Sequence, residues 1–256
     1  MNQLRALLAS GLLLTSLGCS ALSDRELQEQ ENLKMLAAMG LPLPGSGIHI
    51  VPRATLDLSP EALKKGAIEE QEMKTRGYIP SYTERPKELL NFHLQVKDIQ
   101  DGKALPDTST KLRRTVGEIK LGFKPKGFDS ALVNAFSGDI ALLAAVPQGG
   151  FHDEKGGWSG VVQFFMEKHI GTCSYGVMNV KVSQTAAQLA EESVSYDVNG
   201  KPTLLRVEGS DHSGFVYTLE WYDNENFHEL ECANMKYSKS LTDKVLELAN
   251  RIDTLN

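Results

Sequence analysis

Two turn signals followed by an amphipathic segment constrain the fold of this chain more than any other feature. Asn199-Gly200, a dipeptide typical of two-residue β-turns, separates short segments rich in residues that favour strands. The polar residues 223–226 separate two further segments, 215–222 and 227–232, and in the first of them apolar side chains recur at every second position. Residues 240–255 then place apolar side chains at helical spacing. This order predicts antiparallel hairpins with a helix packed on them.

The fold class predicted from this pattern is α+β, an antiparallel sheet with a packed C-terminal helix. Upstream segments fit the same class, although the apolar run at 140–146 is ambiguous between strand and buried helix. We predict strands at 89–97, 116–123, 161–166 and 175–182, and helices at 59–76, 129–136 and 185–192. The final hairpin and terminal helix resemble the Mog1/PsbP-type α-β-α sandwich in element order, which implies a fold and no activity.

The N-terminus has the pattern of an export signal. One positive charge, Arg5, precedes an apolar run at 6–17 that is too short for a membrane span, which needs about 20 residues. Its length and flanks are those of a secretory signal peptide.

The end of this run, Ser16-Leu17-Gly18-Cys19, resembles the lipobox of bacterial lipoproteins, although Ser16 stands where leucine is usual. The resemblance implies cleavage before Cys19, diacylglycerol on its sulfur and an acyl chain on the new amino group. Ser20 implies sorting to the outer membrane, with the domain facing the periplasm. An ordinary signal peptide, or a membrane helix with an incidental cysteine, is the alternative.

We therefore divide the chain into a signal peptide at 1–18, a tether at 19–86 and an α+β periplasmic domain at 87–256. The tether would consist of a helix at 20–39, a segment rich in proline and glycine at 40–52, and a charged helix that starts at Ser59-Pro60 and stops at Gly77.

The remaining cysteines, Cys173 and Cys232, form an even pair in a chain predicted to enter an oxidising compartment. We predict a disulfide between them, with two buried thiols as the alternative. His169 and His228 each precede a cysteine by four residues, which on helices would suggest a zinc site. On strands, residues four apart lie about 13 Å from each other, too far for two ligands of one metal.

Charge and motifs narrow the functional classes. The formal net charge is −6, and loss of the signal peptide with Arg5 makes it more negative, so nucleic acid is not an expected partner. No phosphate loop, dinucleotide fingerprint, nucleophile elbow or His-Glu-x-x-His motif occurs, and we expect neither a cofactor nor a metal. His152-Asp153-Glu154 in a glycine-rich loop is the residual candidate for acid–base chemistry. Asp211-His212-Ser213 holds triad residue types, but adjacent residues cannot form a triad.

Three functions remain open. The first is a non-enzymatic interaction or scaffold subunit of a cell-envelope assembly, such as a secretion-system core, anchored by its lipid and bound to other envelope proteins. The second is a periplasmic carrier or sensor of a small apolar ligand, and the third is an envelope hydrolase acting through His152. For the first two, Phe215, Tyr217 and Trp221 are the candidate ligand or partner surface, because they share one strand face.

Overall fold

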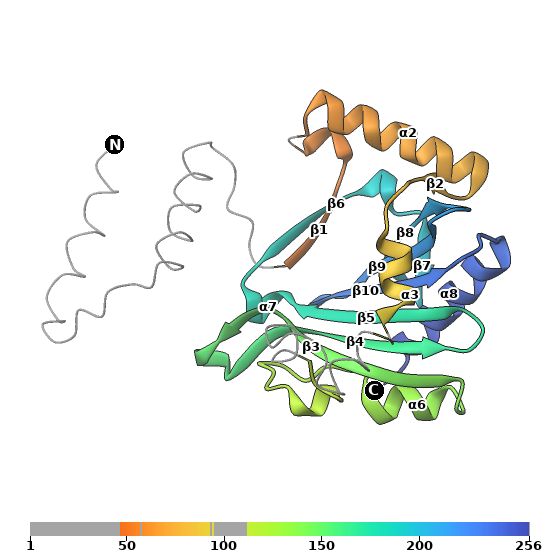
Figure 1. Ribbon diagram of the computed structural model, residues 1–256. Helices are drawn as coiled ribbons and strands as arrows, with labels where there is room; N and C mark the ends of the chain where they lie inside the picture. Colours follow the sequence, from red (N-terminus) through yellow and green to blue (C-terminus); the bar gives the residue numbers. More distant parts are fainter. Residues whose placement is uncertain (1–46, 57, 93, 95–111, 256) are drawn as a thin grey trace, which may run out of the picture. The chain divides into compact units, whose positions relative to one another are not determined.

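The described part of the chain forms one compact body (Figure 1). The computed structural model describes residues 47–56, 58–92, 94 and 112–255, and these fall within a single unit, Gly45–Asn256. The predicted signal peptide, Cys19 and the predicted helix at 20–39 lie outside the described residues. Among the helices that are described, none is long and apolar enough to cross a membrane.

A sheet of eight strands forms the centre of the described body, in the order β2-β8-β9-β10-β5-β4-β3, with β7 also paired to β8. Its strands are β2 (Ile79–Pro80), β3 (Ile140–His152), β4 (Gly157–Glu167), β5 (Gly171–Asn179), β7 (Tyr196–Val198), β8 (Lys201–Ser210), β9 (Gly214–Tyr222) and β10 (Asn226–Asn234). Every pair is antiparallel except β2 with β8. A separate parallel ribbon joins β1 (Gly47–Val51) to β6 (Ala186–Ala190). The predicted α+β class with a largely antiparallel sheet is therefore confirmed.

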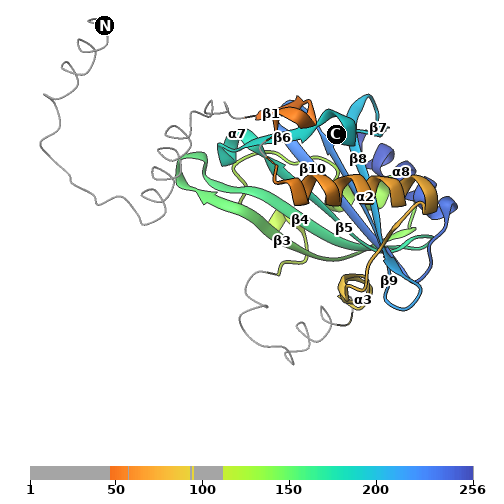
Figure 2. The same ribbon diagram turned by 90° about the horizontal axis from the view of Figure 1, so that it is seen from above.

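Helices lie on both faces of this sheet (Figures 1 and 2). They are α2 (Pro60–Arg76), α3 (Arg85–Leu90), α6 (Asp129–Ala135), α7 (Val180–Ser183) and α8 (Lys239–Asp253), with 3-10 turns η1 (Arg53–Thr55), η2 (Val116–Glu118), η3 (Asp153–Lys155) and η4 (Glu191–Ser193). We call the face covered by α6 and α8 the inner face and the opposite one, near α2 and α3, the outer face. Along β9, Tyr217 and Leu219 belong to the inner face, whereas Val216 packs with Leu89 of α3 on the outer face.

The ends of the two long helices follow their capping residues. The Ser59 hydroxyl accepts a hydrogen bond from the Ala62 N–H at 3.2 Å, and α2 ends at Gly77, whose φ of 79° lies in the left-handed region. Ser238 caps α8 in the same way, accepting from Leu241 N–H at 3.1 Å. Both predicted helices are confirmed. Their ends could be predicted because capping residues close in the sequence define them.

Both predicted hairpins are also confirmed. Asn199 and Gly200 have φ values of 51° and 81°, the conformation that a two-residue turn between twisted strands requires. In the β9–β10 turn, the Asp223 carboxylate accepts hydrogen bonds from the backbone N–H groups of Glu225 and Asn226, at 2.8 and 2.7 Å.

The predicted tether is wrong over residues 47–86, because this stretch is part of the compact unit. β1 pairs with β6, β2 pairs with β8, and Glu69 of α2 forms an ion pair with Arg206 of β8. The pairing partners lie more than a hundred residues further along the chain, so no local pattern shows them. The unit starts near Gly45 and not at residue 87.

Three local predictions are wrong for identifiable reasons. Residues 186–190 form β6 and not a helix, because pairing with β1 prevails over the helix propensity of an alanine-rich segment. Residues 89 and 90, predicted to begin a strand, instead end α3, which has Pro86 in its first turn. Residues 93 and 95–97 of that predicted strand lie outside the described part. Residues 116–118 form η2, where Asp129 accepts hydrogen bonds from the N–H groups of Val116 and Gly117.

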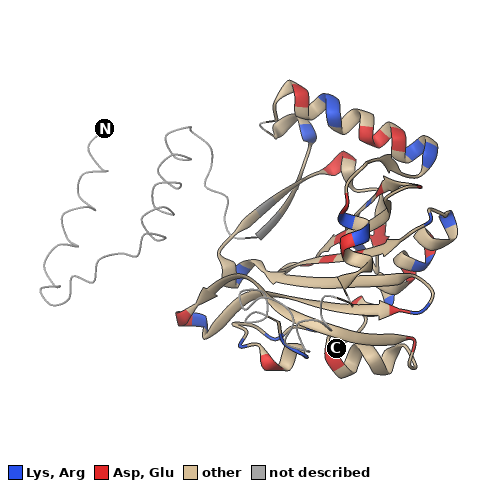
Figure 3. Ribbon diagram, viewed as in Figure 1, with Lys and Arg blue, Asp and Glu red and all other residues tan. Residues whose placement is uncertain are grey.

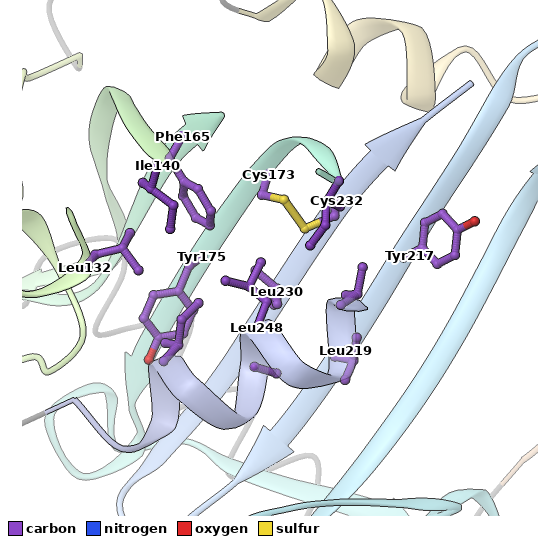
Figure 4. Packing of buried hydrophobic residues seen from close by; sticks show 14 of the residues in the cluster. Leu132, Ile140, Phe165, Cys173, Tyr175, Tyr217, Leu219, Leu230, Cys232 and Leu248 are labelled. Atoms are coloured by element: carbon purple, nitrogen blue, oxygen red, sulfur yellow. A yellow bond between two sulfur atoms is a disulfide. The ribbon is translucent and has the colours of Figure 1, made fainter. Parts of the chain in front are cut away.

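The inner face holds the main hydrophobic core (Figure 4). Leu219 of β9, Leu230 of β10 and Leu248 of α8 are at most 2 % exposed. Cys173 of β5 and Cys232 of β10 lie directly opposite each other in register and are joined by the predicted disulfide. The disulfide therefore ties two neighbouring strands beneath α8, inside the core.

Candidate functional site

The three aromatic side chains expected to form a ligand or partner surface do not form one. Phe215, Tyr217 and Trp221 share a strand face as predicted, but it is the inner face, and each is at most 1 % exposed. Trp221 Nε1 donates to Asp253 Oδ1 of α8 at 2.9 Å, and Tyr217 donates to the Lys236 carbonyl at 3.2 Å. The expectation fails because the terminal helix covers this face, and the helix and the segment before it accept the hydrogen bonds of Trp221 and Tyr217.

Of the two histidines near the cysteines, His228 takes part in a chain of side-chain hydrogen bonds. Tyr175 Oη lies 3.0 Å from His228 Nδ1, and Asp223 Oδ2 lies 3.0 Å from His228 Nε2. Burial raises the pKa of the Tyr175 hydroxyl, and His228 is only 8 % exposed. The chain of hydrogen bonds joins Tyr175 of β5 and His228 of β10 to Asp223 of the β9–β10 turn, and its two ring side chains are buried. No group of three or more His, Cys, Asp or Glu among the described residues is arranged to hold a metal.

The other loop candidates lie in two turns of the sheet, and Ser213 is buried there. His152 Nδ1 lies 3.6 Å from Glu154 Oε1 at the β3–β4 turn, and Asp153 is exposed. Ser213 shares a 2.7 Å hydrogen bond with Ser210 across the β8–β9 turn. Neither group lines the two hollows described next, so the structure does not bring these residues together with one another or with either cavity.

A groove of about 650 Å³ lies between α2, the η4 region and the outer side of β8. Its volume falls in the range of about 300–1,000 Å³ that is typical of ligand pockets. Apolar side chains from both walls line it, including Leu58, Ala62, Leu63, Met73, Ile79 and Leu204. Leu58 and Leu63 are each 41 % exposed, so the groove presents apolar surface to solvent.

Most charged side chains in the groove are paired with an opposite charge, although Lys74 has no ion pair among the described residues. Arg206 Nη1 lies 2.7 Å from Glu69 Oε2, and its other Nη donates to Glu208 at 3.0 Å. The Arg206 guanidinium holds the pKa of Glu69 below its usual value. Arg53 likewise pairs with Glu70. Figure 3 shows charges of both signs along α2.

These ion pairs join α2 and the segment before it to the rest of the body. Arg53 Nη2 donates to the Ser193 hydroxyl at 2.9 Å, and its backbone N–H donates to Glu192 at 2.9 Å. The walls of the groove are thereby held in place, and apart from Lys74 the surface outside these ion pairs is mainly apolar. A ligand seated there would gain mainly from burial of apolar area.

A second, smaller pocket of about 320 Å³ lies on the inner side of the sheet. It is bounded by the end of α6, the β4–β5 turn and one stripe of α8. Phe136, Ile170 and Leu248 line its apolar part, and all three are at most 5 % exposed. Charged groups from all three elements also line it, among them Glu167 and Arg251.

Sequence reasoning missed both hollows. The helix in the groove was predicted, but it was expected in a solvated tether, and nothing local links it to residues 192–206. For the smaller pocket a signal existed, because Val161, Phe165 and Glu167 have the same parity along β4. That alternation places the Glu167 carboxylate on the core side, which is unusual for a charged residue.

A scan against protein-family models, a search of curated proteins and a search of solved structures each found no match to this chain. The functional conclusions therefore rest on the residues and geometry described above.

Proposed function

We propose that the chain is a lipoprotein, anchored in the outer membrane through Cys19, whose domain is a non-enzymatic binding subunit of a cell-envelope assembly. The groove between α2 and β8 is the binding site, and its occupant is an apolar segment of another envelope protein. The observation that carries the proposal is the groove itself, with exposed Leu58 and Leu63 on walls held in place by ion pairs.

Two features support the cellular location. The segment that ends at Cys19 has the pattern of a lipoprotein signal. The Cys173–Cys232 disulfide is the kind of bond that persists in oxidising compartments such as the periplasm. Replacement of Cys19 by serine should release the protein from the outer-membrane fraction, and unchanged sedimentation with that fraction would contradict lipid anchoring.

The binding role is tested by filling the groove. Gly66 lines the groove, and a Cβ added there meets no atom within 4 Å, so Gly66→Trp should occupy the groove without disturbing the fold. Ile68 lies on the same helix, is 53 % exposed and does not line the groove, which makes Ile68→Trp the matched control.

The measurement is purification of each tagged full chain from membranes in mild detergent, with quantification of co-purifying proteins. Wild type and Ile68→Trp should retain the same envelope proteins at a fixed ratio, and Gly66→Trp should lose them. Equal recovery with both tryptophan variants would exclude the groove as the binding site.

A second candidate function is transport or sensing of a small apolar molecule, which the groove volume of about 650 Å³ also suits. Native mass spectrometry of the same preparations distinguishes the two. A small molecule bound to wild type and absent from Gly66→Trp, without protein partners, would favour the carrier.

A further inference from the structure

The pocket on the inner side of the sheet has an apolar floor and charged walls. Phe136 follows α6, Ile170 lies in the β4–β5 turn and Leu248 belongs to α8, so three separate elements build the floor. Its volume of about 320 Å³ corresponds to roughly ten water molecules, which gives room for one small molecule.

Glu167 is the unusual member of the wall. It is 8 % exposed, and the one hydrogen bond found for its side chain is from the His169 N–H to Oε2, at 2.7 Å. Carboxylates are rarely this buried unless they are paired. The neighbouring acid Asp139 already lies 3.7 Å from Lys168. Glu247 of α8 also lines the pocket but is exposed, so Glu167 is the buried carboxylate available to a cationic group.

The α8 wall carries two basic side chains, Lys244 and Arg251, and one acidic side chain, Glu247. Lys244, Leu248 and Arg251 repeat at helical spacing on one stripe of α8, and all three line the pocket. Arg251 is held in place, because its guanidinium lies 3.8 Å from the Phe136 ring centroid and donates to the Ala135 carbonyl. Among the described residues, Lys244 forms no ion pair, so its ammonium group is available to an anion.

We propose that this pocket binds a small zwitterion, an α-amino acid with an apolar side chain. The ammonium group pairs with Glu167, the carboxylate faces Lys244 and Arg251, and the side chain lies on Phe136, Ile170 and Leu248. A buried carboxylate of β4 and two basic side chains of α8, around an apolar floor, match this arrangement of groups and disfavour ligands that lack one charge. The inference is independent of the groove and of the lipid anchor.

Calorimetric titration of the purified full chain tests the proposal with three probes of similar size. L-phenylalanine carries both charges, 3-phenylpropanoate lacks the amine and 2-phenylethylamine lacks the carboxylate. We expect phenylalanine to bind with a Kd on the order of 0.1–1 mM and each analogue to bind at least about tenfold more weakly. Absence of phenylalanine binding at about 10 mM, or equal affinity for 3-phenylpropanoate, would overturn the proposal.

Variants test which side chain binds the ammonium group of the ligand and which binds its carboxylate. Glu167→Gln should weaken phenylalanine about tenfold and leave 3-phenylpropanoate unchanged, whereas Lys244→Ala should weaken phenylalanine and leave 2-phenylethylamine unchanged. Lys244 is exposed, so its variant decides the question if Glu167→Gln does not fold. Lys64→Ala, on an exposed position of α2, is the control and should bind like wild type. Equal phenylalanine affinity in wild type and Lys244→Ala would contradict the assignment.

Discussion

The two faces of the sheet differ in how they are completed. On the inner face α8 fills the space over Tyr217, Leu219 and Trp221, and each of these side chains is fully buried. On the outer face α2 is joined to β8 through charged pairs such as Glu69 with Arg206, and a groove remains between them. The inner face over β9 is therefore filled by α8, whereas the groove on the outer face leaves apolar side chains exposed.

This difference explains why aromatic content alone is a poor guide to a binding surface. The richest aromatic strand, β9, contributes Phe215, Tyr217 and Trp221 to the core. The surface available for binding comes from smaller aliphatic side chains, Leu58 and Leu63, near ion pairs. Loss of stability should therefore follow substitutions in the inner-face core, and loss of the proposed partner binding should follow substitutions in the outer-face groove.

The largest effect on stability is expected from a substitution on the inner face. Trp221→Ala removes a fully buried ring and its hydrogen bond to Asp253, and should lower the free energy of unfolding by roughly 3–5 kcal/mol. Leu63→Ala in the groove should change it by less than about 1 kcal/mol. Urea unfolding of both variants measures the difference, and equal losses would contradict the division between the two faces.

The second largest effect on stability is expected from loss of the disulfide. Cys173 and Cys232 are 59 residues apart, and on the chain-entropy model their bond stabilises by up to about 4 kcal/mol. The double variant Cys173→Ala with Cys232→Ala should lose this amount, and a reducing agent should destabilise wild type but not the double variant. Insensitivity of wild type to reduction in thermal unfolding would count against a structural role.

A smaller, pH-dependent effect on stability is expected from Glu229 on the outer face. Burial, with Glu231 and Glu220 nearby, raises the pKa of Glu229 to about 7. A carboxyl whose pKa is higher in the folded than in the unfolded chain contributes stability below its unfolded pKa, near 4.3, and this is lost as pH rises through 7.

Glu229→Gln should therefore stabilise the protein at pH 8 by on the order of 1 kcal/mol, after allowance for solvent screening, and its advantage should vanish near pH 4. Thermal unfolding at both pH values measures this, with Glu191→Gln at an exposed position as the control. An advantage of the same size at both pH values would rule out ionisation of Glu229 as the cause.

The smallest expected effect is a gain in stability. Gly66 lies inside α2, and a methyl group at this position would extend into open space, so Gly66→Ala should raise the free energy of unfolding by roughly 0.5–1 kcal/mol. A loss on this substitution, measured by urea unfolding, would show that the groove wall depends on glycine at this position.

The sequence predicts well those elements that local chemistry determines. Ser59 and Gly77 define the ends of α2, Asn199-Gly200 defines the β7–β8 turn, and helical spacing defines α8. The parity of β9 was also predicted correctly, but the sequence does not say which face a helix will cover. Because α8 covers this face of β9, the aromatic side chains expected at a surface lie in the core.

Pairing between distant segments could not be predicted. β1 pairs with β6 and Arg53 contacts Glu192, across about 140 residues, and these contacts build the groove. Each segment taken alone is typical of a tether, a solvated helix or a loop. The disulfide was predictable because cysteines are few, whereas acidic and basic residues are too numerous to assign partners by inspection.

Photo-crosslinking from the groove in intact cells would test the central claim most directly. A photoreactive amino acid is placed at residue 63, inside the groove, or at residue 68, on the same helix outside it. We expect position 63 to crosslink a defined envelope protein, with the adduct lost when Gly66→Trp is added, and position 68 to give no such adduct. Adducts of equal yield from both positions, or adducts that persist with Gly66→Trp, would contradict the groove as the binding site.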